Sequence, residues 1–561
     1  MEDFNQTPAL ADYNLFTSDC ALQEAVQREG AAAAFANLAE AGAALGTAAM
    51  FEHGRLANRN APILHTDNAQ NERIDCIEFH PSWHVLMQGI CSRGYHVGPW
   101  AQGRISGGAA THAARAAGYL LQAQVECGTL CPTTMTYGAI AAMRRDAGLV
   151  RDWLPRLLTH EYDARDLPIA LKRGGLIGMG MTEKQGGSDV RSNTTRATPG
   201  ADGSYRIKGH KWFFSAPQCD AHLVLAQGER GLSCFFMPRR LPDGTRNGIH
   251  IQRLKDKLGN RSNASSEVEF VDAWGHLIGE DGRGIPTILE MGTYTRLDCV
   301  TGTAGMMRQA LVQALHHARH RRVFGALLID QPLMQSVLAD LAIESEAATV
   351  LALRLARAFD GHGENEIALR RALTSAAKFW VCKRGCELAV EAMEVLGGNG
   401  YTEDLPLARM ARETPVNSIW EGSGNIMCLD VLRAFARSAA TREVVLHELS
   451  VARGLHGKFD AAFARFAADA SSPGEAQGRR FAQMFVTLMQ GALLLRAANS
   501  GRAGDAPPGS RMATGADRGA SAVAEGFCAT RLDPDSGWGA VFGASRAALD
   551  TAAILDRAWQ E

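Results

Sequence analysis

The sequence predicts an α+β multidomain protein, in which a helical N-terminal domain precedes a central antiparallel β domain, a C-terminal four-helix bundle and a further helical extension. Three observations indicate this order. Helical periodicity dominates residues 12–173, short alternating strands separated by turn residues begin near Gly174, and helical periodicity returns near Ile285. We therefore expect four domains, at residues 1–175, 176–285, 286–440 and 441–561.

Composition and charge exclude several classes of protein. The chain is 46% hydrophobic, and 58 Lys and Arg against 60 Asp and Glu give a net charge of −2, which excludes a uniformly basic protein. The opening residues MEDFNQTPAL contain no Lys or Arg, so they do not predict a signal peptide. Twelve cysteines are too dilute for a disulfide scaffold. We expect a protein of the reducing cytoplasm.

Alanine-rich amphipathic runs, such as residues 111–126 and 136–145, predict the N-terminal helices. The most apolar stretch, residues 31–51, is mostly Ala and contains Asn37 and Glu40. A membrane-spanning helix needs about 20 strongly apolar residues. We therefore expect this stretch to form a soluble helix with close neighbours.

Three pairs of potential metal ligands occur four residues apart, and we interpret all of them as structural. No second ligand pair accompanies the cysteine pairs, which predicts small buried or half-buried thiols on helices. The motif HPSWH lacks the Glu of a HExxH zinc site, which predicts a packed helix start. The pairs are Cys127 with Cys131, Cys382 with Cys386, and His80 with His84. We expect no metal site.

Short segments of alternating apolar residues predict the β domain, as an antiparallel sandwich or barrel, because no helical pattern lies between them. The predicted strands are residues 205–215, 222–227, 232–238, 249–254 and 266–271. Long helical patterns with short connections predict the bundle and the extension. The predicted helices are residues 311–322, 332–359, 364–396 and 426–437 in the bundle, and 444–466 and 481–498 in the extension. The Gly/Ala/Pro-rich stretch 500–520 predicts a loop or flexible connector.

The first segment that could carry chemistry is MTEKQGGSDV, residues 181–190, which follows the strand-like LIGMG. Its paired glycines would let backbone N–H groups approach a ligand, and Thr182 and Ser188 offer hydroxyl groups for ring heteroatoms or a phosphate. An ordinary turn is the alternative interpretation.

The second segment is GHKWFFS, residues 209–215, on a predicted strand. Alternation places Trp212 and Phe214 on one face and Phe213 and Ser215 on the other. An aromatic pair on a strand is usually core, but a flat indole beside a polar Ser could instead form one wall of a slot for a ring.

The third segment is SIWEGSGNIM, residues 418–427, which places Glu421 just before Gly-Ser-Gly and the start of a helix. A helix N-terminus attracts anions, and small residues let a ligand approach. A partly desolvated carboxylate at Glu421 could act as a general base. A solvated residue near a helix start is the alternative.

The order and contexts of these three segments resemble the acyl-CoA dehydrogenase superfamily over about residues 80–437. RRVFG, residues 321–325, is similar to the Arg-x-x-Phe-Gly motif of that family, and EVLGGNGY, residues 394–401, to its Gln-x-x-Gly-Gly-x-Gly-Tyr motif. The resemblance implies a helical domain, a β domain and a four-helix bundle around FAD. It also implies a homo-oligomer, usually a tetramer, because the Arg-x-x-Phe-Gly motif reaches the FAD of a neighbouring subunit.

The same resemblance assigns cofactor contacts to the β-domain loop and strand, the Arg-x-x-Phe-Gly motif, the Gly-rich turn and the surroundings of Glu421. These residues are Met181, Thr182, Gly187, Ser188, Trp212, Phe213, Phe214, Ser215, Arg321, Phe324, Gly397, Gly398, Gly400, Trp420, Gly422, Ser423, Gly424 and Asn425.

Glu421 matches the commonest position of the family's catalytic base. The resemblance implies that Glu421 removes the α proton of an acyl-CoA thioester while the β hydride moves to flavin N5. Some relatives carry the base directly before an Arg on the first bundle helix, but here Thr295 precedes Arg296, so Glu421 is the matching candidate.

Two positions depart from the family pattern and weaken the expectation of ordinary acyl-CoA binding. The Gln expected near the pyrophosphate is Glu394, and the Gln expected eight residues after Phe324 is Pro332, with Gln331 one place earlier.

Within the superfamily the chain most resembles the AidB branch, flavoproteins of the bacterial adaptive response to DNA alkylation. The stretches MTEKQGGSDVRSNTTRA and TPVNSIWEGSGNIMCLDVLR and the long helical extension carry this resemblance. It implies binding of double-stranded DNA through the C-terminal helical region, with Arg433 at the matching position. Arg437 and Arg442 follow close by, and such clusters can contact phosphates without reading sequence.

Two other hypotheses remain open from the sequence. The first is an ordinary metabolic acyl-CoA dehydrogenase whose extension serves only assembly. The second is a DNA-shielding protein with a structural flavin and no catalysis at Glu421. A solvated helix face is the ordinary interpretation of a few arginines, and residues 440–561 contain 13 Lys and Arg and 13 Asp and Glu.

Overall fold

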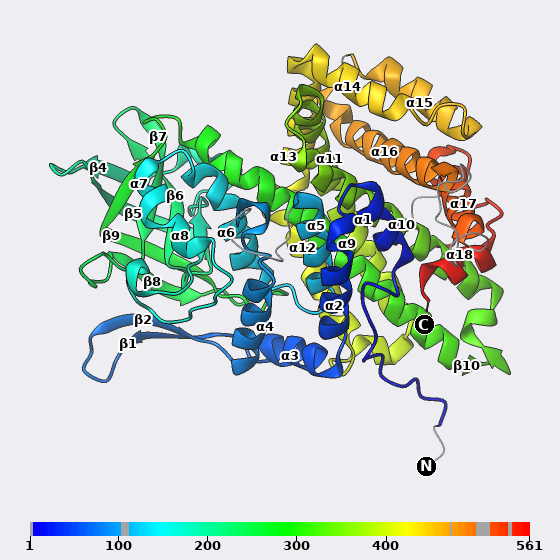
Figure 1. Ribbon diagram of the computed structural model, residues 1–561, viewed down its shortest axis with the longest axis horizontal. Coiled ribbons are helices and arrows are strands. Elements are labelled where there is room, and N and C mark those ends of the chain that lie inside the picture. The colour runs from blue at the N-terminus through cyan, green and yellow to red at the C-terminus, as the bar shows by residue number, and fades with distance from the viewer. Residues whose placement is uncertain (1–3, 102–110, 472–473, 501–515, 537–540, 561) are drawn as a thin grey trace. The chain divides into compact units, whose positions relative to one another are not determined.

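The computed structural model describes residues 4–101, 111–471, 474–500, 516–536 and 541–560. The chain forms two compact units (Figure 1). The helical unit comprises Met1–Ala48, His112–Gln124 and Cys299–Glu561, and the β-rich unit comprises Ala49–Thr111 and Val125–Asp298. The stretch expected as an N-terminal helical domain is therefore divided between the two units.

The β-rich unit contains a hairpin, short helices and a seven-stranded sheet. Its helices are α3 (Ala48–Arg59), α4 (Pro81–Ser92), α6 (Leu130–Met143), α7 (Ala147–Asp152), α8 (Leu154–Leu157) and the first part of α9 (Gly284–His320). Its strands are β1 (Ile63–Asp67), β2 (Arg73–Glu78), β3 (Ile177–Gly180), β4 (Arg196–Pro199), β5 (Tyr205–Ser215), β6 (Ala221–Gly228), β7 (Gly231–Pro238), β8 (Ile249–Leu254) and β9 (Ser265–Ile278).

All five predicted strands are present, and β5 and β8 have the predicted bounds. The sheet order is β3-β5-β4-β6-β7-β9-β8, and an additional β5–β9 pairing closes β4, β6, β7, β9 and β5 into a ring. This confirms the barrel alternative. The expectation of a wholly antiparallel sheet is wrong, because β3 and β4 both pair with β6 in parallel. Each of these strands has only four residues, too few to show alternation in the sequence.

Apolar side chains from the ring strands and from β8 form one buried core cluster. They are Ala197, Ile207, Phe214, Val224, Ala226, Phe235, Met237, Ile249, Ile251, Val268, Phe270 and Ala273. Because protein interiors are close-packed, this core gives β5 a rigid support.

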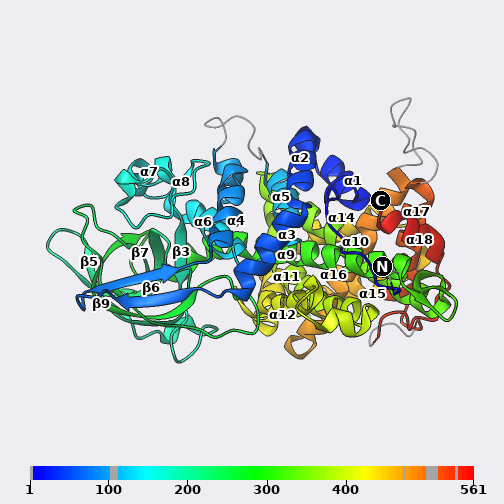
Figure 2. The same cartoon turned by 90° about the horizontal axis from the view of Figure 1, so that it is seen from below.

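Residues 12–173 are mainly helical, as predicted, and the β1–β2 hairpin is an unpredicted interruption. Its β2 strand is tied to β8, since the guanidinium of Arg73 donates to the Ile251 carbonyl at 2.5 Å and the Asp75 carboxylate accepts from the Ile251 N–H at 3.2 Å. Figure 2 shows this hairpin, in blue, lying along the sheet. The sequence does not predict these strands, because each is a short run of alternating residues within a helical region.

The metal-like pairs have the structural roles predicted for them. The imidazole of His80 accepts from the Ser82 N–H and caps the start of α4. The four paired cysteines are free thiols, buried or half-buried, although Cys127 precedes α6 rather than lying on a helix. Within the described ranges, no group of three or more His, Cys, Asp or Glu side chains could hold a metal ion.

The helical unit is built mainly from long helices. They are α1 (Cys20–Arg28), α2 (Phe35–Leu45), α5 (His112–Ala123), the rest of α9, α10 (Pro332–Asp360), α11 (Glu364–Val395), α12 (Pro406–Ile419), α13 (Gly424–Arg437), α14 (Ala439–Ser450), α15 (Gly457–Asp469), α16 (Gly478–Ser500), α17 (Ala516–Phe527) and α18 (Thr551–Ala558). A small hairpin, β10 (Arg322–Val323) with β11 (Ala326–Leu327), follows α9. Helix α11 packs against α10, α12 and α13.

Two expected helices are broken. Residues 31–51 are not one helix, because α2 ends at Leu45 and a Cβ on Gly46 would lie 1.7 Å from the Tyr13 carbonyl oxygen. Residues 444–466 fall in two helices, α14 and α15. Helix α12, which contains Pro415, was not predicted.

The extension packs on α13 through aromatic rings. The ring of Phe435 lies 4.9 Å from that of Phe481, and Phe466 stacks on Phe481 at 5.1 Å. The window Glu475–Asn499 is long and apolar enough to cross a membrane by length and composition, but 72% of it is buried within the protein. Of the expected connector 500–520, residues 501–515 lie outside the described residues and the last five belong to α17.

Candidate cofactor and catalytic sites

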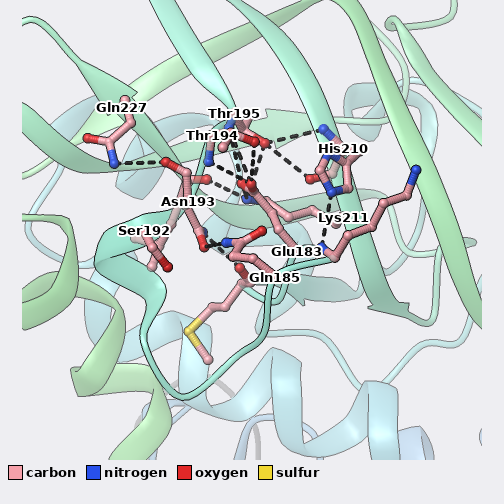
Figure 3. A network of polar contacts seen from close by, with 12 residues as sticks. Glu183, Gln185, Ser192, Asn193, Thr194, Thr195, His210, Lys211 and Gln227 are labelled. Carbon is pink, nitrogen blue, oxygen red and sulfur yellow. Dashed lines mark hydrogen bonds and ion pairs between the residues drawn. The ribbon is translucent and has the colours of Figure 1, made fainter.

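In the β-rich unit, the loop after β3 is held by one buried carboxylate. Glu183 accepts hydrogen bonds from the Thr194 N–H at 2.7 Å, the Thr194 hydroxyl at 2.9 Å and the Thr195 N–H at 3.2 Å (Figure 3). It also forms an ion pair with the Nζ of Lys211 at 2.7 Å, and both side chains are fully buried. Since Lys211 lies on β5, this pair joins the loop to the strand.

The two charges stabilise each other. Burial alone would raise the pKa of Glu183, but the ammonium of Lys211 and the hydrogen bonds of Thr195 and Thr194 lower that pKa from 4.5 to about 2. Burial lowers the pKa of Lys211 to about 8, against the opposing effect of Glu183. Lys211 also donates to the Leu225 carbonyl at 2.7 Å, which ties β6 to the same network.

The tip of the loop contains the two glycines of the turn that the sequence predicts to bind a ligand. Gly186 has a φ of +134°, and an added Cβ there would meet no described atom within 4 Å. At Gly187, a Cβ would lie 2.4 Å from the Thr182 hydroxyl oxygen. Met181 and Thr182 are half-buried and Ser188 is exposed. The glycines thus leave the backbone and the two hydroxyl groups accessible.

A bulge in β5 changes the predicted faces of the aromatic segment. Lys211 pairs with Val268 and Phe214 with Ser266, so three steps along β5 match two along β9. Phe214 is fully buried in the ring core, whereas Trp212 is half-buried and Phe213 is 50% exposed. The expectation that Trp212 and Phe214 share a face is therefore wrong.

Trp212 and Phe213 instead share a cationic neighbour. The Nζ of Lys255 lies 3.6 Å from the Trp212 ring centroid and 4.7 Å from that of Phe213. Lys184 and Arg253 lie within 6.0 Å of the Trp212 ring, while Glu267 pairs with Arg253 and Lys255. The result is an accessible aromatic wall, with the half-buried Ser215 at its end, in a net positive environment that suits an anionic ring cofactor.

In the helical unit, Glu421 occupies a tight turn between α12 and α13. Its φ is +59° and that of Gly422 is +104°. Lys378, fully buried on α11, donates to the Trp420 carbonyl at 2.7 Å and to the Gly422 carbonyl at 2.5 Å. A non-Gly residue in the left-handed region is strained, and such strain persists where the surroundings enforce it. Lys378 is that enforcing group.

The residues that follow Glu421 form the start of α13. Ser423 is the N-cap of α13, and Gly424 lies next to Lys383, whose Cε would be 3.2 Å from an added Cβ. The Asn425 side chain accepts from Arg479 at 3.1 Å. The indole N–H of Trp420 is buried without a hydrogen-bond partner among the described residues, which fits a missing ligand acceptor.

The RRVFG motif forms the turn between β10 and β11. Phe324 and Gly325 have φ values of +51° and +85°, and the Phe324 side chain is 100% exposed. Such a projecting ring suits a contact made outside the subunit. Gln331 donates to the Val323 carbonyl at 3.3 Å, and Pro332 is the first residue of α10. In this chain Gln331 thus supports the hairpin.

The Gly-rich turn after α11 contains one glycine required for packing, Gly400, and two with open space around them, Gly397 and Gly398. A Cβ on Gly400 would lie 2.2 Å from the Met393 carbonyl oxygen, whereas a Cβ on Gly398 would meet no described atom within 4 Å. Gly397 has a φ of +60°. Glu394, at the position of the expected Gln, is exposed on the last turn of α11.

The three arginines proposed for nucleic acid have different environments. Arg433 and Arg437 are exposed on α13, and within the described ranges neither makes a hydrogen bond or an ion pair. Arg442 is half-buried and donates to the Phe435 carbonyl at 2.6 Å, so it caps the end of α13.

Sequence reasoning missed the buried charges Glu183, Lys211 and Lys378, which position the candidate residues. Glu183 and Lys211 lie within motifs and Lys378 lies in none, but a charged residue is most often solvated, so only the burial seen in the structure distinguishes them. The burial of Lys211 has one indication in the sequence, because this lysine lies within an aromatic strand segment.

Known proteins resemble the chain over most of its length. Residues 5–164 match the family described as adaptive response protein AidB N-terminal domain. Residues 178–273 and 282–436 match the acyl-CoA dehydrogenase middle and C-terminal domains. AidB of Escherichia coli (strain K12) is 52% identical over 498 residues, which are 88% of this chain and 92% of that protein.

Two solved structures share the fold. Caenorhabditis elegans ACDH-11, solved in complex with C11-CoA, is 25% identical with a TM-score of 0.81 and covers 94% of this chain and 93% of its own. An acyl-CoA dehydrogenase from Bacillus anthracis complexed with FAD is 18% identical with a TM-score of 0.64, over 80% of each chain, and is similar in fold alone.

Proposed function

Because this chain belongs to the AidB branch of the acyl-CoA dehydrogenase family of FAD-dependent oxidoreductases, we propose that it oxidises a CH–CH bond of an acyl-CoA or similar small molecule with Glu421 as base. The observation that carries this proposal is the turn at Glu421. Lys378 holds the backbone on both sides of Glu421, so the point from which the Glu421 side chain extends is fixed. Precise placement is what a general base requires.

The residues present fit FAD as the cofactor. In the β-rich unit, Thr182 and Ser188 would offer hydroxyl groups, while Trp212, Phe213 and Ser215 would form a wall and Phe214 would support it from the core. In the helical unit, the open backbone at Gly398 would admit the pyrophosphate. When bound, FAD supplies an N5 position that accepts the β hydride.

Glu421 then has one task in the reaction. The thioester carbonyl acidifies the α C–H bond, and the Glu421 carboxylate takes that proton as the α–β double bond forms and the β hydride leaves. Exclusion of water around the carboxylate would increase its basicity, and general-base help of this kind contributes about 10²- to 10⁴-fold in rate.

Anaerobic mixing of the FAD-loaded protein with isovaleryl-CoA and related thioesters tests this function. Flavin absorbance should fall in the wild type and in the control Glu443→Gln, an exposed glutamate on α14, and should fall at least 10²-fold more slowly in Glu421→Gln. No bleaching by any thioester, or equal rates in the wild type and Glu421→Gln, would remove Glu421 as a working base.

We also propose that the protein works in the cytoplasm as a homo-oligomer, with a tetramer as the expected assembly. The fully exposed Phe324 supports association of copies, because a projecting aromatic ring is stabilised when a second copy covers it. Sedimentation of the FAD-loaded protein tests the assembly.

A second proposed function is binding and protection of double-stranded DNA during alkylation stress. Arg433 and Arg437 support it, because they lie one turn apart on α13 and are exposed. Arg442 has a structural role as a cap and would contribute less.

Gel mobility of duplex DNA at several salt concentrations separates this function from that of an ordinary metabolic enzyme. Arg433→Ala with Arg437→Ala should weaken binding and reduce the salt slope by about one to two units. Arg206→Ala with Arg283→Ala removes two exposed arginines of the β-rich unit and is the matched control. If the two double variants bind alike, α13 is not the DNA surface.

A further inference from the structure

A short N-terminal segment, residues 5–8, lies along the RRVFG hairpin. The side chain of Asn5 brackets one residue of this motif, because its Oδ1 accepts from the Arg322 N–H at 2.8 Å and its Nδ2 donates to the Arg322 carbonyl at 2.8 Å. The Asn5 carbonyl accepts from the Arg321 guanidinium at 2.6 Å. Asn5 has a φ of +58°, a conformation that Asn tolerates better than most residues.

The next three residues continue the contact. The Thr7 hydroxyl lies 3.0 Å from the Nδ1 of His317, and the Pro8 carbonyl accepts from the Nε2 of His316 at 2.9 Å. Gln6 accepts from the Asn399 side chain in the Gly-rich turn at 3.4 Å. Along the chain, the segment therefore contacts the hairpin, then the Gly-rich turn and then the end of α9.

The last turn of α9 is held from a second direction by Trp559, which is buried. Its ring centroid lies 5.8 Å from that of His316 and 5.0 Å from the Arg319 guanidinium carbon. Its carbonyl accepts from the Arg319 side chain at 3.2 Å. Residues near both ends of the chain thus converge on the helix turn that leads into Arg321.

We propose that residues 5–8 and Trp559 form a brace that positions Arg321 and Phe324 for FAD binding. This inference rests on the proposed function, in which both residues contact FAD. An isolated two-stranded hairpin is marginally stable in water, and here each strand has two residues, so its geometry depends on neighbours. A brace that orders the hairpin before FAD arrives lowers the entropy lost on binding and so increases affinity.

Asn5 offers a selective test, because both hydrogen bonds that its side chain makes with described residues are to the backbone of Arg322 in the hairpin. Asn5→Ala should weaken FAD binding to the apoprotein, followed by flavin fluorescence, on the order of tenfold. The thermal midpoint of the apoprotein should stay near that of the wild type. Asn5→Asp keeps the acceptor for the Arg322 N–H and should restore part of the affinity. Asn68→Ala, which removes a half-buried Asn whose side chain likewise bonds to turn backbone, in the β1–β2 turn, is the matched control and should bind FAD normally.

A double-mutant cycle shows whether Asn5 acts through Arg321. In an Arg321→Ala background, Asn5→Ala should have a much smaller effect on FAD affinity, because coupled residues are not additive. Trp559→Ala should weaken FAD binding in the same way, and Trp559→Phe, which keeps a ring against His316, should weaken it less.

Two results would overturn the proposal, and they distinguish failure of the brace from failure of the proposed function. If the wild type binds FAD and Asn5→Ala binds it equally tightly, or loses the same affinity with and without Arg321, the brace is rejected while the proposed function stands. If the wild type takes up no FAD, the proposed function fails and the brace fails with it.

Discussion

Lys378 fixes the backbone of Glu421 from both sides, since its Nζ donates to the carbonyl groups of Trp420 and Gly422. The turn between these carbonyls contains a glutamate with a φ of +59°, which an L-residue adopts at a cost of about 1–2 kcal/mol. The position of the candidate base thus depends on a lysine in α11, 43 residues earlier in the chain.

Replacing this lysine should slow catalysis more than it weakens cofactor binding. Lys378→Met keeps a similar side-chain length and removes the donor to the partly buried carbonyl groups of Trp420 and Gly422, which should lower the free energy of unfolding by about 1–3 kcal/mol. Flavin reduction by an acyl-CoA should become about 10- to 100-fold slower, because a small displacement of a catalytic group has effects of this size. Lys208→Met, at an exposed lysine on β5, is the control in stopped-flow measurements. An unchanged rate in Lys378→Met would show that the turn forms without it.

The Glu183–Lys211 pair makes stability depend on pH in the acid range. The pKa of Glu183 falls from 4.5 to about 2 on folding, so the folded state binds fewer protons than the unfolded state between these values. Its contribution, about 3 kcal/mol, is present above pH 4.5 and lost as the pH falls toward 2. Urea titrations between pH 2 and 7, which follow unfolding of the β-rich unit, measure this loss in the free energy of unfolding.

Glu183→Gln is the matching variant. It should lower the free energy of unfolding at pH 7 by about 3–5 kcal/mol, because it leaves the Lys211 ammonium buried and unpaired. The difference from the wild type should shrink as the pH falls below 4.5, where the wild type loses the same interaction. A difference that stays constant from pH 7 to pH 2 would contradict the assigned pKa.

A substitution at Gly398 distinguishes an effect on FAD binding from an effect on stability. A Cβ there meets no described atom, so Gly398→Ala should leave the apoprotein's stability within about 0.5 kcal/mol of the wild type. If FAD approaches this backbone, the same methyl group should weaken FAD binding at least tenfold by equilibrium titration. Gly363→Ala, also at an open glycine, should change neither quantity. Normal FAD affinity in Gly398→Ala would exclude close approach at this turn.

The extension is anchored by a buried arginine. Arg531, 1% exposed, pairs with Asp340 and with Glu344 at 3.0 Å, both on α10. Arg531→Met should lower the free energy of unfolding by about 3–5 kcal/mol, because buried Asp340 loses its ion-pair partner and buried Glu344 keeps only its ion pair with Arg384. Arg518→Met removes an exposed arginine of α17 and should have an effect below about 1 kcal/mol in the same denaturant titration. Similar effects of the two variants would contradict the anchoring role.

Long or strongly alternating elements were predictable from the sequence, and short or interrupted ones were not. Strands β5 and β8 were located to the residue, because their alternation is bounded by turn residues. The β1–β2 hairpin and α12 were missed, the first for its shortness and the second because Pro415 interrupts the helical pattern.

For the candidate sites, motif residues could be located from the sequence but their supports could not. Glu421 and Gly187 stand in recognisable motifs, whereas the role of Lys378 depends on bringing α11 against the turn after α12, a long-range contact with no local signal. The burial of Phe214 also needed the structure, because a bulge reverses the simple alternation of β5.

Closure of the β ring has a consequence for amide hydrogen exchange. Strand β5 has partners on both sides, β4 and β9, and the Trp212 N–H is bonded to the Thr182 carbonyl at 2.8 Å. The β5 amides that pair within the closed ring should therefore be protected from exchange to a level approaching that of global unfolding. Trp212 and Phe213 are carried by this strand, so adaptation to different small molecules should come from other parts of the protein.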